Sequence, residues 1–267
     1  MSDQFIWHNG AIVDAVSVPL PQDRTHSGFW LGDGLFETFL AENGEIFAKD
    51  RHLKRLLAAS NTMDLHPNLD RIEVGISMAL SWLGNRSGQV RLSYLSSDDV
   101  IVTAREHETP SQPLRLIEFP HPRSDSSLLN GIKSLSYGES AVALRYARSR
   151  GCDDVITSNS KGEVVETALA NILFWDGSTW LTPKRSSGCL PGVTRELLIE
   201  YFSIQESDFS VKEIQEMRSL ATTSSLRDVQ GVSSFQDISG NRFSFEQEPV
   251  DRLRQSFKEW RRKNPHP

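Results

Sequence analysis

Three turn pairs, each lying between short apolar runs, constrain the fold of this chain more than any other feature. Asn9-Gly10, Asn43-Gly44 and Asp176-Gly177 favour two-residue hairpin turns, because both central residues of such turns need a positive φ. Each pair predicts two antiparallel strands that are neighbours in the sequence. Asp50 is predicted to be the N-cap of a helix between the hairpins. Apolar residues follow a helical spacing in residues 50–57, 68–83, 140–150, 193–201 and 250–263. Helices together with antiparallel hairpins predict an α+β fold.

A polar stretch that contains prolines divides the chain. Residues 120–130 read PHPRSDSSLLN, a composition typical of a linker between domains. A chain of 267 residues is long enough to form two hydrophobic cores. We therefore predict an N-terminal α+β domain in residues 1–119, a linker in 120–130 and a C-terminal domain in 131–267.

The composition excludes several kinds of partner. A net charge of −6 argues against a surface that binds nucleic acid or anionic lipid. The two cysteines, Cys152 and Cys189, form no disulfide framework, and His26, His52 and His121 show no metal-ligand spacing. No signal peptide begins the chain, and no apolar run approaches the roughly 18 residues of a membrane span. The sequence predicts a cytoplasmic protein without a metal, nucleic-acid or membrane partner.

Lys133 is a candidate nucleophile. It lies between Ile132 and Leu135, just before a predicted helix. Apolar neighbours desolvate a lysine and favour its neutral amine, which is the form that attacks an aldehyde. On this local pattern alone, an ordinary surface lysine is the simpler interpretation.

Glu166 is a candidate acid within a predicted strand. Apolar residues surround it in the stretch EVVETALANILF. A buried carboxylate needs a partner, and a protonated pyridine nitrogen is one such partner. A solvent-exposed glutamate at a strand edge is the alternative.

A proline–glycine turn before the helix at 193–201 is a candidate phosphate site. After Pro191 and Gly192, the backbone N–H groups of Val193 and Thr194 begin the helix and have no partner within it. A plain helix start is the alternative interpretation. Further phosphate donors could come from Arg55, in a basic stretch, and from the serine pair Ser224-Ser225.

In combination, these motifs resemble the class IV pyridoxal-phosphate enzymes, which have fold type IV. That family includes branched-chain aminotransferases, D-amino-acid aminotransferases and 4-amino-4-deoxychorismate lyases. The motifs follow the order of the family from residue 7 to the 220s, which makes the set specific although each motif is weak. They are Trp7-His8-Asn9-Gly10, Gly32-Asp33-Gly34-Leu35-Phe36-Glu37-Thr38, His52-Leu53-Lys54-Arg55-Leu56, Lys133-Ser134-Leu135-Ser136-Tyr137, Gly162-Glu163-Val164-Val165-Glu166, Ala170-Asn171-Ile172, Thr182-Pro183 and Leu190-Pro191-Gly192-Val193-Thr194-Arg195.

The resemblance implies pyridoxal 5'-phosphate as the cofactor and gives each candidate a role. Lys133 would form the Schiff base and move the substrate proton, Glu166 would pair with the pyridinium nitrogen, and Tyr137 would lie near the phenolic oxygen. The implied fold resembles D-amino-acid aminotransferases: a small N-terminal α+β domain and a C-terminal β-barrel-like domain with helices, in a homodimer with the cofactor between the domains. The implied phosphate ligands are Arg55, Val193, Thr194, Ser224 and Ser225.

The Gly-Asp-Gly-Leu-Phe-Glu-Thr stretch and the chain length resemble the 4-amino-4-deoxychorismate lyase branch, which releases pyruvate and 4-aminobenzoate in the folate pathway. A transaminase of branched-chain or D-amino acids is the alternative, because it would use the same Lys133 and Glu166 on an amino substrate. A non-catalytic binding relative is a third possibility, and the retention of Thr194 with these two residues argues against it.

The residues that would hold the substrate carboxylate depart from the family pattern. Many members carry Arg-Gly where this chain has Ser96-Ser97. If that arginine holds the carboxylate, Arg91 or Arg105 must replace it here. Trp30 and Thr38 are further candidates for substrate contact, and residues 17–27 and 105–112 are expected to form walls of the pocket.

Overall fold

The computed structural model describes residues 4–14 and 28–267, so the predicted pocket wall at 17–27 lies outside the described residues. The chain forms two compact units. The N-terminal unit comprises Met1–Glu108, Ile132–Tyr137 and Pro265–Pro267, and the C-terminal unit comprises Thr109–Gly131 and Gly138–Asn264.

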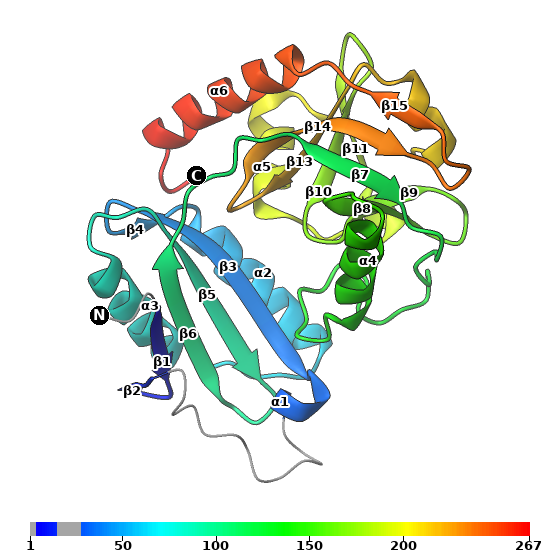
Figure 1. The fold of residues 1–267 in the computed structure, drawn as a ribbon. Coiled ribbons are helices and arrows are strands. Elements are labelled where there is room, and N and C mark those ends of the chain that lie inside the picture. The colour runs from blue at the N-terminus through cyan, green and yellow to red at the C-terminus, as the bar shows by residue number, and fades with distance from the viewer. Residues whose placement is uncertain (1–3, 15–27) are drawn as a thin grey trace. The chain divides into compact units, whose positions relative to one another are not determined.

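The N-terminal unit contains an antiparallel sheet with the strand order β2-β1-β6-β5-β3-β4. Two helices pack on one face of this sheet, where their apolar residues and those of the strands form a single core (Figure 1). The elements are β1 (Phe5–His8), β2 (Ala11–Ile12), α1 (Gly28–Leu31), β3 (Gly34–Glu42), β4 (Glu45–Ile46), α2 (Lys49–Thr62), α3 (Leu69–Leu83), β5 (Gly88–Leu95) and β6 (Val100–Glu106).

Alternation along β3 decides which side chains meet the helices. Leu35 and Phe39 belong to the core beneath α2 and α3. Glu37 lies between them on the same face, because side chains two residues apart in a strand point the same way. Phe36 and Thr38 point to the opposite face. One strand therefore supplies a buried carboxylate on one face and an aromatic ring on the other.

The two predicted hairpins of this unit are confirmed. Asn9 and Gly10 both have positive φ angles between β1 and β2, and Asn43 and Gly44 do so between β3 and β4. The expected N-cap of α2 is wrong. Asp50 lies within the first turn, and the cap is Ala48, whose left-handed backbone makes no side-chain capping bond.

The C-terminal unit contains a nine-stranded sheet with the order β12-β11-β10-β13-β14-β7-β8-β9, in which β15 also pairs with β14. The last strand, β9, packs against β10 and β11, so the sheet curls around an apolar core (Figure 1). The elements are β7 (Leu114–Glu118), α4 (Gly138–Ser149), β8 (Asp154–Ser158), β9 (Val164–Thr167), β10 (Asn171–Trp175), β11 (Trp180–Pro183), η1 (Arg185–Ser187), α5 (Val193–Phe202), β12 (Gln205–Ser207), η2 (Val211–Glu216), β13 (Ser219–Ser224), β14 (Asp228–Gln236), β15 (Arg242–Ser244) and α6 (Glu248–Lys263).

The two units divide the chain differently from the predicted domains. Strand β7 belongs to the C-terminal unit, because it pairs in parallel with both β8 and β14. Residues 120–130 also lie in that unit, where the Arg123 backbone N–H donates to Ser158 O at 2.8 Å. Ile132–Tyr137 joins the N-terminal unit, because Leu135 N donates to Gly34 O at 2.9 Å beside β3.

Strand β14 was not expected from the sequence, because its nine residues include Gly231 and five polar side chains. Packing explains the glycine. A Cβ at Gly231 would lie 2.2 Å from Gln247 Oε1. A residue without a side chain at this position therefore allows Gln247 to pack against the strand. The Gln247 side-chain amide then donates to Val232 O at 2.8 Å and ties the start of α6 to the sheet.

Candidate functional site

Lys133 lies beside β3 in the N-terminal unit. The Phe36 N–H donates to Lys133 O at 3.0 Å, which fixes the lysine backbone next to the strand. The Lys133 Nζ atom lies 4.3 Å from the centroid of the Phe36 ring, on the face of β3 opposite the helices. The lysine is therefore held at a defined place by both its backbone and its side chain.

Two further candidates surround the same aromatic ring. The Arg91 Cζ atom lies 3.8 Å from the Phe36 centroid, and the Tyr137 ring meets Phe36 edge-on at 5.4 Å. Burial lowers the pKa of Arg91, and the nearby Tyr137 opposes this effect. No residue in the described part of the chain accepts a hydrogen bond from the Arg91 guanidinium or forms an ion pair with it. Lys133, Tyr137 and Arg91 therefore form one cluster around Phe36.

The other substrate candidates lie in different settings. Thr38 is opposite Arg91 in the β3–β5 register and shares its face of the sheet. Arg105 is exposed and donates to Gln89 Oε1 at 2.8 Å, so its side chain is engaged at the sheet surface. Trp30 lies in the short helix α1 and is 43% exposed. Of the two candidate arginines, only Arg91 accompanies Lys133.

Arg55 projects from α2 toward β3 and binds Glu37 through two parallel bonds. Its Nε atom donates to Oε1 at 2.8 Å and its Nη2 atom donates to Oε2 at 2.6 Å. His52 Nδ1 lies 2.8 Å from the same Oε2. Burial alone would raise the pKa of Glu37, but the Arg55 charge and the His52 hydrogen bond outweigh it and lower the pKa to about 2.

Glu166 is the centre of a second polar network, in the C-terminal unit. Arg123 Nη1 donates to its Oε1 at 2.7 Å, and Asn171 Nδ2 donates to its Oε2 at 3.1 Å. The Leu190 backbone N–H donates to the same Oε2 at 3.2 Å. The side chain is 12% exposed. Strand β9 thus supplies a carboxylate that is held in place and still reached by solvent.

Asn171 connects Glu166 to the start of α5. Besides its bond to Glu166, its Nδ2 atom donates to Leu190 O at 2.9 Å. A Cβ at Gly192 would lie 1.9 Å from Asn171 Oδ1, so only glycine allows this approach. Val193 and Thr194 follow as the first residues of α5, and no side chain caps that helix start. Their N–H groups are the type that binds an anion at a helix N-terminus.

The Ser224-Ser225 turn lies at the same end of the sheet. Asn171 is opposite Thr223 in the β10–β13 register, and Ser224 is the next residue of β13. The turn is closed by a bond from Arg227 N to Ser224 O at 3.1 Å. The C-terminal unit therefore brings Glu166, the α5 start and this serine turn to neighbouring strand ends.

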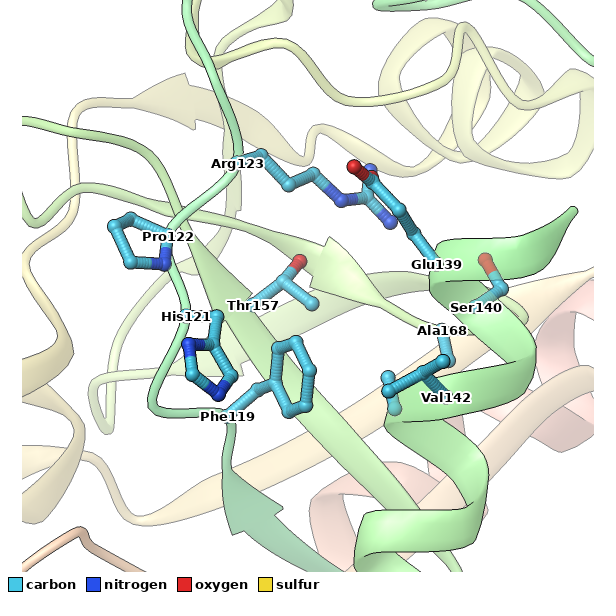
Figure 2. A pocket seen from close by; sticks show the side chains of 10 residues that line it. Phe119, His121, Pro122, Arg123, Glu139, Ser140, Val142, Thr157 and Ala168 are labelled. Atoms are coloured by element: carbon cyan, nitrogen blue, oxygen red, sulfur yellow. The ribbon is translucent and has the colours of Figure 1, made fainter. Parts of the chain in front are cut away.

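A cavity of about 280 Å³ lies next to Glu166 in the same unit. Arg123 and Thr157 line it, and Thr157 Oγ1 donates to Glu166 O at 2.8 Å. Figure 2 shows Arg123 and Glu139 among the side chains that line the cavity, with the rings of Phe119 and His121 side by side. None of the predicted site residues lines this cavity.

The family model for class IV aminotransferases matches residues 34–235. This chain belongs to the class IV aminotransferase family.

Three comparisons place this family member among its relatives. It is 23% identical to the "Probable branched-chain-amino-acid aminotransferase" of Rickettsia conorii, with 96% of each chain covered. It is 29% identical to the "Bifunctional aminodeoxychorismate lyase / D-amino acid transaminase" of Mycobacterium tuberculosis, with 63% of this chain and 68% of that protein covered. A PLP-bound hypothetical aminotransferase from Mycobacterium tuberculosis superimposes with a TM-score of 0.80 at 22% identity, over 95% of this chain and 98% of the other. The structural likeness confirms the predicted type IV fold.

The predicted cofactor, pyridoxal phosphate, is that of this class IV family. The residues of the C-terminal unit fit its chemistry. Glu166 can accept a hydrogen bond from a pyridinium nitrogen, and the uncapped N–H groups of Val193 and Thr194 suit a phosphate. In residues 4–14 and 28–267, no group of three or more potential ligands could hold a metal ion. No helix in that part of the chain is long and apolar enough to cross a membrane.

Sequence reasoning missed four residues of these networks: Glu37, His52, Arg123 and Asn171. Glu37 carried a signal, because it interrupts the buried face of β3 between Leu35 and Phe39. A charged residue at such a position needs a partner of opposite charge within reach. His52 and Asn171 lie within the quoted motifs, but their sequence context does not indicate these bonds. Arg123 gave no signal, because the Glu166 that it binds is 43 residues away.

Proposed function

We propose that this protein is a pyridoxal-phosphate-dependent lyase that converts 4-amino-4-deoxychorismate to 4-aminobenzoate and pyruvate. The observation that carries the proposal is the cluster of Lys133 and Arg91 around the Phe36 ring. A partly buried guanidinium that has no acidic partner among residues 4–14 and 28–267 suits a substrate carboxylate. The Phe36 and Tyr137 rings suit the six-membered carbon ring that bears it.

The pyridoxal phosphate cofactor is proposed to be bound by the residues that the sequence predicts for it. Arg55, the first N–H groups of α5 and the Ser224-Ser225 turn would hold its phosphate. Glu166 would hold its ring nitrogen, with Tyr137 near its phenolic oxygen. The bound cofactor supplies the aldehyde that captures the substrate amine and an electron sink for the pair left by a departing proton.

Lys133 is proposed to perform the proton transfer. Its amine takes the proton from the ring carbon that bears the substrate nitrogen. The C–O bond at the neighbouring ring carbon then breaks, and the enolpyruvyl group leaves and takes up a proton to become pyruvate. The ring becomes aromatic in this step, so no oxidant or second substrate is needed. Arg91 would hold a substrate carboxylate so that the reacting carbon faces Lys133.

A transaminase of branched-chain or D-amino acids is the second candidate. The relative that is named for both a lyase and a D-amino acid transaminase activity supports it. A transaminase would use the same Lys133 and Glu166 but would need a keto acid to complete its cycle. The homodimer and the cytoplasmic location stay predictions from the sequence.

The deciding experiment is a direct assay of the purified, cofactor-loaded protein with 4-amino-4-deoxychorismate. Release of 4-aminobenzoate and pyruvate in equal amounts, without any keto acid, is the expected result. A panel of amino acids tests the second candidate in parallel. Conversion of the bound cofactor to its amine form by an amino donor, without pyruvate release from aminodeoxychorismate, would favour the transaminase. A colourless protein that takes up no pyridoxal phosphate would overturn both.

Arg91 and Arg105 form a matched pair for the substrate site. Arg91→Gln is expected to raise KM about tenfold or more, because it removes a charge-assisted bond to a carboxylate. Arg105→Gln is expected to leave KM unchanged, because Arg105 is engaged with Gln89 at the surface. Equal effects of the two substitutions would remove Arg91 from the proposed substrate site.

A further inference from the structure

We propose that Glu37 is a positioning residue which, together with His52, fixes the guanidinium of Arg55 for the cofactor phosphate. This inference rests on the proposed function, because it takes Arg55 as a phosphate ligand. It concerns a residue that does not itself contact the cofactor and that acts only through Arg55.

The backbone dictates the meeting of these three residues. His52 and Arg55 are three positions apart in α2, so their side chains lie on the same face of the helix. That face packs on β3, whose inward-pointing side chains include Glu37. The carboxylate is 1% exposed and lies between both donors.

Because the Glu37 carboxylate is buried, it depends on these two partners. A carboxylate removed from water is costly unless hydrogen bonds and opposite charges compensate for the lost solvation. Glu37 has that compensation from Arg55 on both oxygens and from His52 on Oε2. Burial lowers the pKa of His52, against the opposing effect of its bond to Glu37. The network is thus a buried acid with two donors from a single helix face.

The geometry of the Arg55–Glu37 pair gives it a function beyond stability. A guanidinium is planar, and Glu37 engages it through Nε and Nη2 at once. Two parallel bonds prevent the plane from rotating, so the directions of the remaining N–H groups are fixed as well. Binding a phosphate with donors that are already oriented avoids the entropy cost of ordering a long side chain.

The charge of Glu37 matters in the same way. The positive charges of Arg55 and Lys133 both lie near enough to His52 to lower its pKa. Glu37 offsets one of these charges. Arg55 therefore binds the phosphate mainly through its oriented N–H groups. Its positive charge contributes less to this binding, because Glu37 offsets it.

The test compares two ligands that differ only in the phosphate. The full-length protein, freed of its cofactor, is titrated with pyridoxal 5'-phosphate and with pyridoxal, and binding is followed by absorbance and by quenching of tryptophan fluorescence. Glu37→Gln is expected to weaken pyridoxal phosphate binding about tenfold and to leave pyridoxal binding unchanged. The reason is that a glutamine presents an NH₂ group to one of the two guanidinium donors.

Controls separate positioning from general support of the fold. Glu106→Gln removes the charge from an exposed Glu–Arg pair of the same unit and is expected to change neither affinity. His52→Leu leaves the Arg55–Glu37 pair intact and is expected to weaken pyridoxal phosphate binding by about threefold. His52→Asn is expected to restore it, because its amide can donate to Glu37. If Glu37→Gln does not fold, the two His52 variants still test whether the network positions Arg55.

The outcomes are distinct. Equal weakening of both ligands by Glu37→Gln, or no weakening of either, overturns the positioning role. Arg55→Gln is measured in parallel. If it leaves the ratio of the two affinities unchanged, the phosphate role of Arg55 fails and the inference falls with it. A wild-type protein that binds neither ligand overturns the proposed function itself.

Discussion

The two units each hold a glutamate paired with an arginine, and the two pairs differ in burial. Glu37 is 1% exposed, and side chains of a single helix supply its bonds. Glu166 is 12% exposed, and its donors come from three separate places: Arg123, Asn171 and the Leu190 backbone. The same pairing can therefore seal a carboxylate inside the fold or present it to a ligand. The difference teaches that burial, more than the partner, separates the acid proposed to position Arg55 from the acid proposed to contact the cofactor.

The largest effect is expected at Lys133, the proposed nucleophile. Lys133→Ala is expected to reduce activity about a thousandfold or more, because it removes the amine that is proposed to move the substrate proton. The visible absorbance of the bound cofactor should disappear with it. Lys54→Ala, at an exposed position of α2, is the matched control. A Lys133→Ala protein that stays coloured and active would contradict the assignment.

The next largest effect tests the burial difference directly. Glu37→Ala is expected to lower the free energy of unfolding by about 3–5 kcal/mol, because it leaves the buried His52 and the Arg55 charge uncompensated. Glu166→Ala is expected to lower it by about 1–2 kcal/mol, because Arg123 can turn to solvent. Urea unfolding at pH 7 gives both values. Equal losses would show that the two networks are alike.

The pH dependence of stability sharpens the same contrast. The pKa of Glu37 falls from 4.5 to about 2 on folding. A lowered pKa stabilises the fold fully above the unfolded value, and that stabilisation is lost as pH falls toward the folded value. The shift corresponds to about 3 kcal/mol, of which about 2 kcal/mol is lost between pH 4.5 and pH 3. Unfolding of wild type and Glu37→Gln across this range should show a smaller slope in the variant.

The remaining prediction concerns backbone geometry in the C-terminal unit. Gly192→Ala would place a Cβ 1.9 Å from Asn171 Oδ1 and push that side chain away from Glu166. We expect a loss of about 1–3 kcal/mol in unfolding free energy and weaker binding of pyridoxal phosphate. Gly138→Ala, where a Cβ meets open space, is the control. Unchanged cofactor affinity in Gly192→Ala would show that the Asn171 contact does not contribute to the proposed phosphate site.

Local patterns were sufficient to predict much of the fold. The hairpins at Asn9-Gly10 and Asn43-Gly44 follow from the conformational preferences of the two turn residues alone. Helix α3 was predictable as well, with Asn68 capping it by accepting from Arg71 N at 3.0 Å. Strand β14 was not, because the space that its Gly231 needs is defined by Gln247 on another element.

The residues of the candidate site also divide into those that the sequence predicts and those that it does not. Lys133, Glu166 and Thr194 are predicted as site residues from the order of their motifs along the chain. Arg123 was not, because 43 residues separate it from the Glu166 carboxylate that it binds.

The sequence by itself determined the antiparallel hairpins, the helical segments, the family and its cofactor. These rest on neighbouring residues or on motif order, which the chain carries without folding. Only the tertiary structure decided that Glu37 is sealed while Glu166 is reached by solvent. It also decided that Arg91, and not Arg105, accompanies Lys133. Burial and charge pairing depend on which distant side chains packing brings within a few ångströms, and no local pattern specifies that.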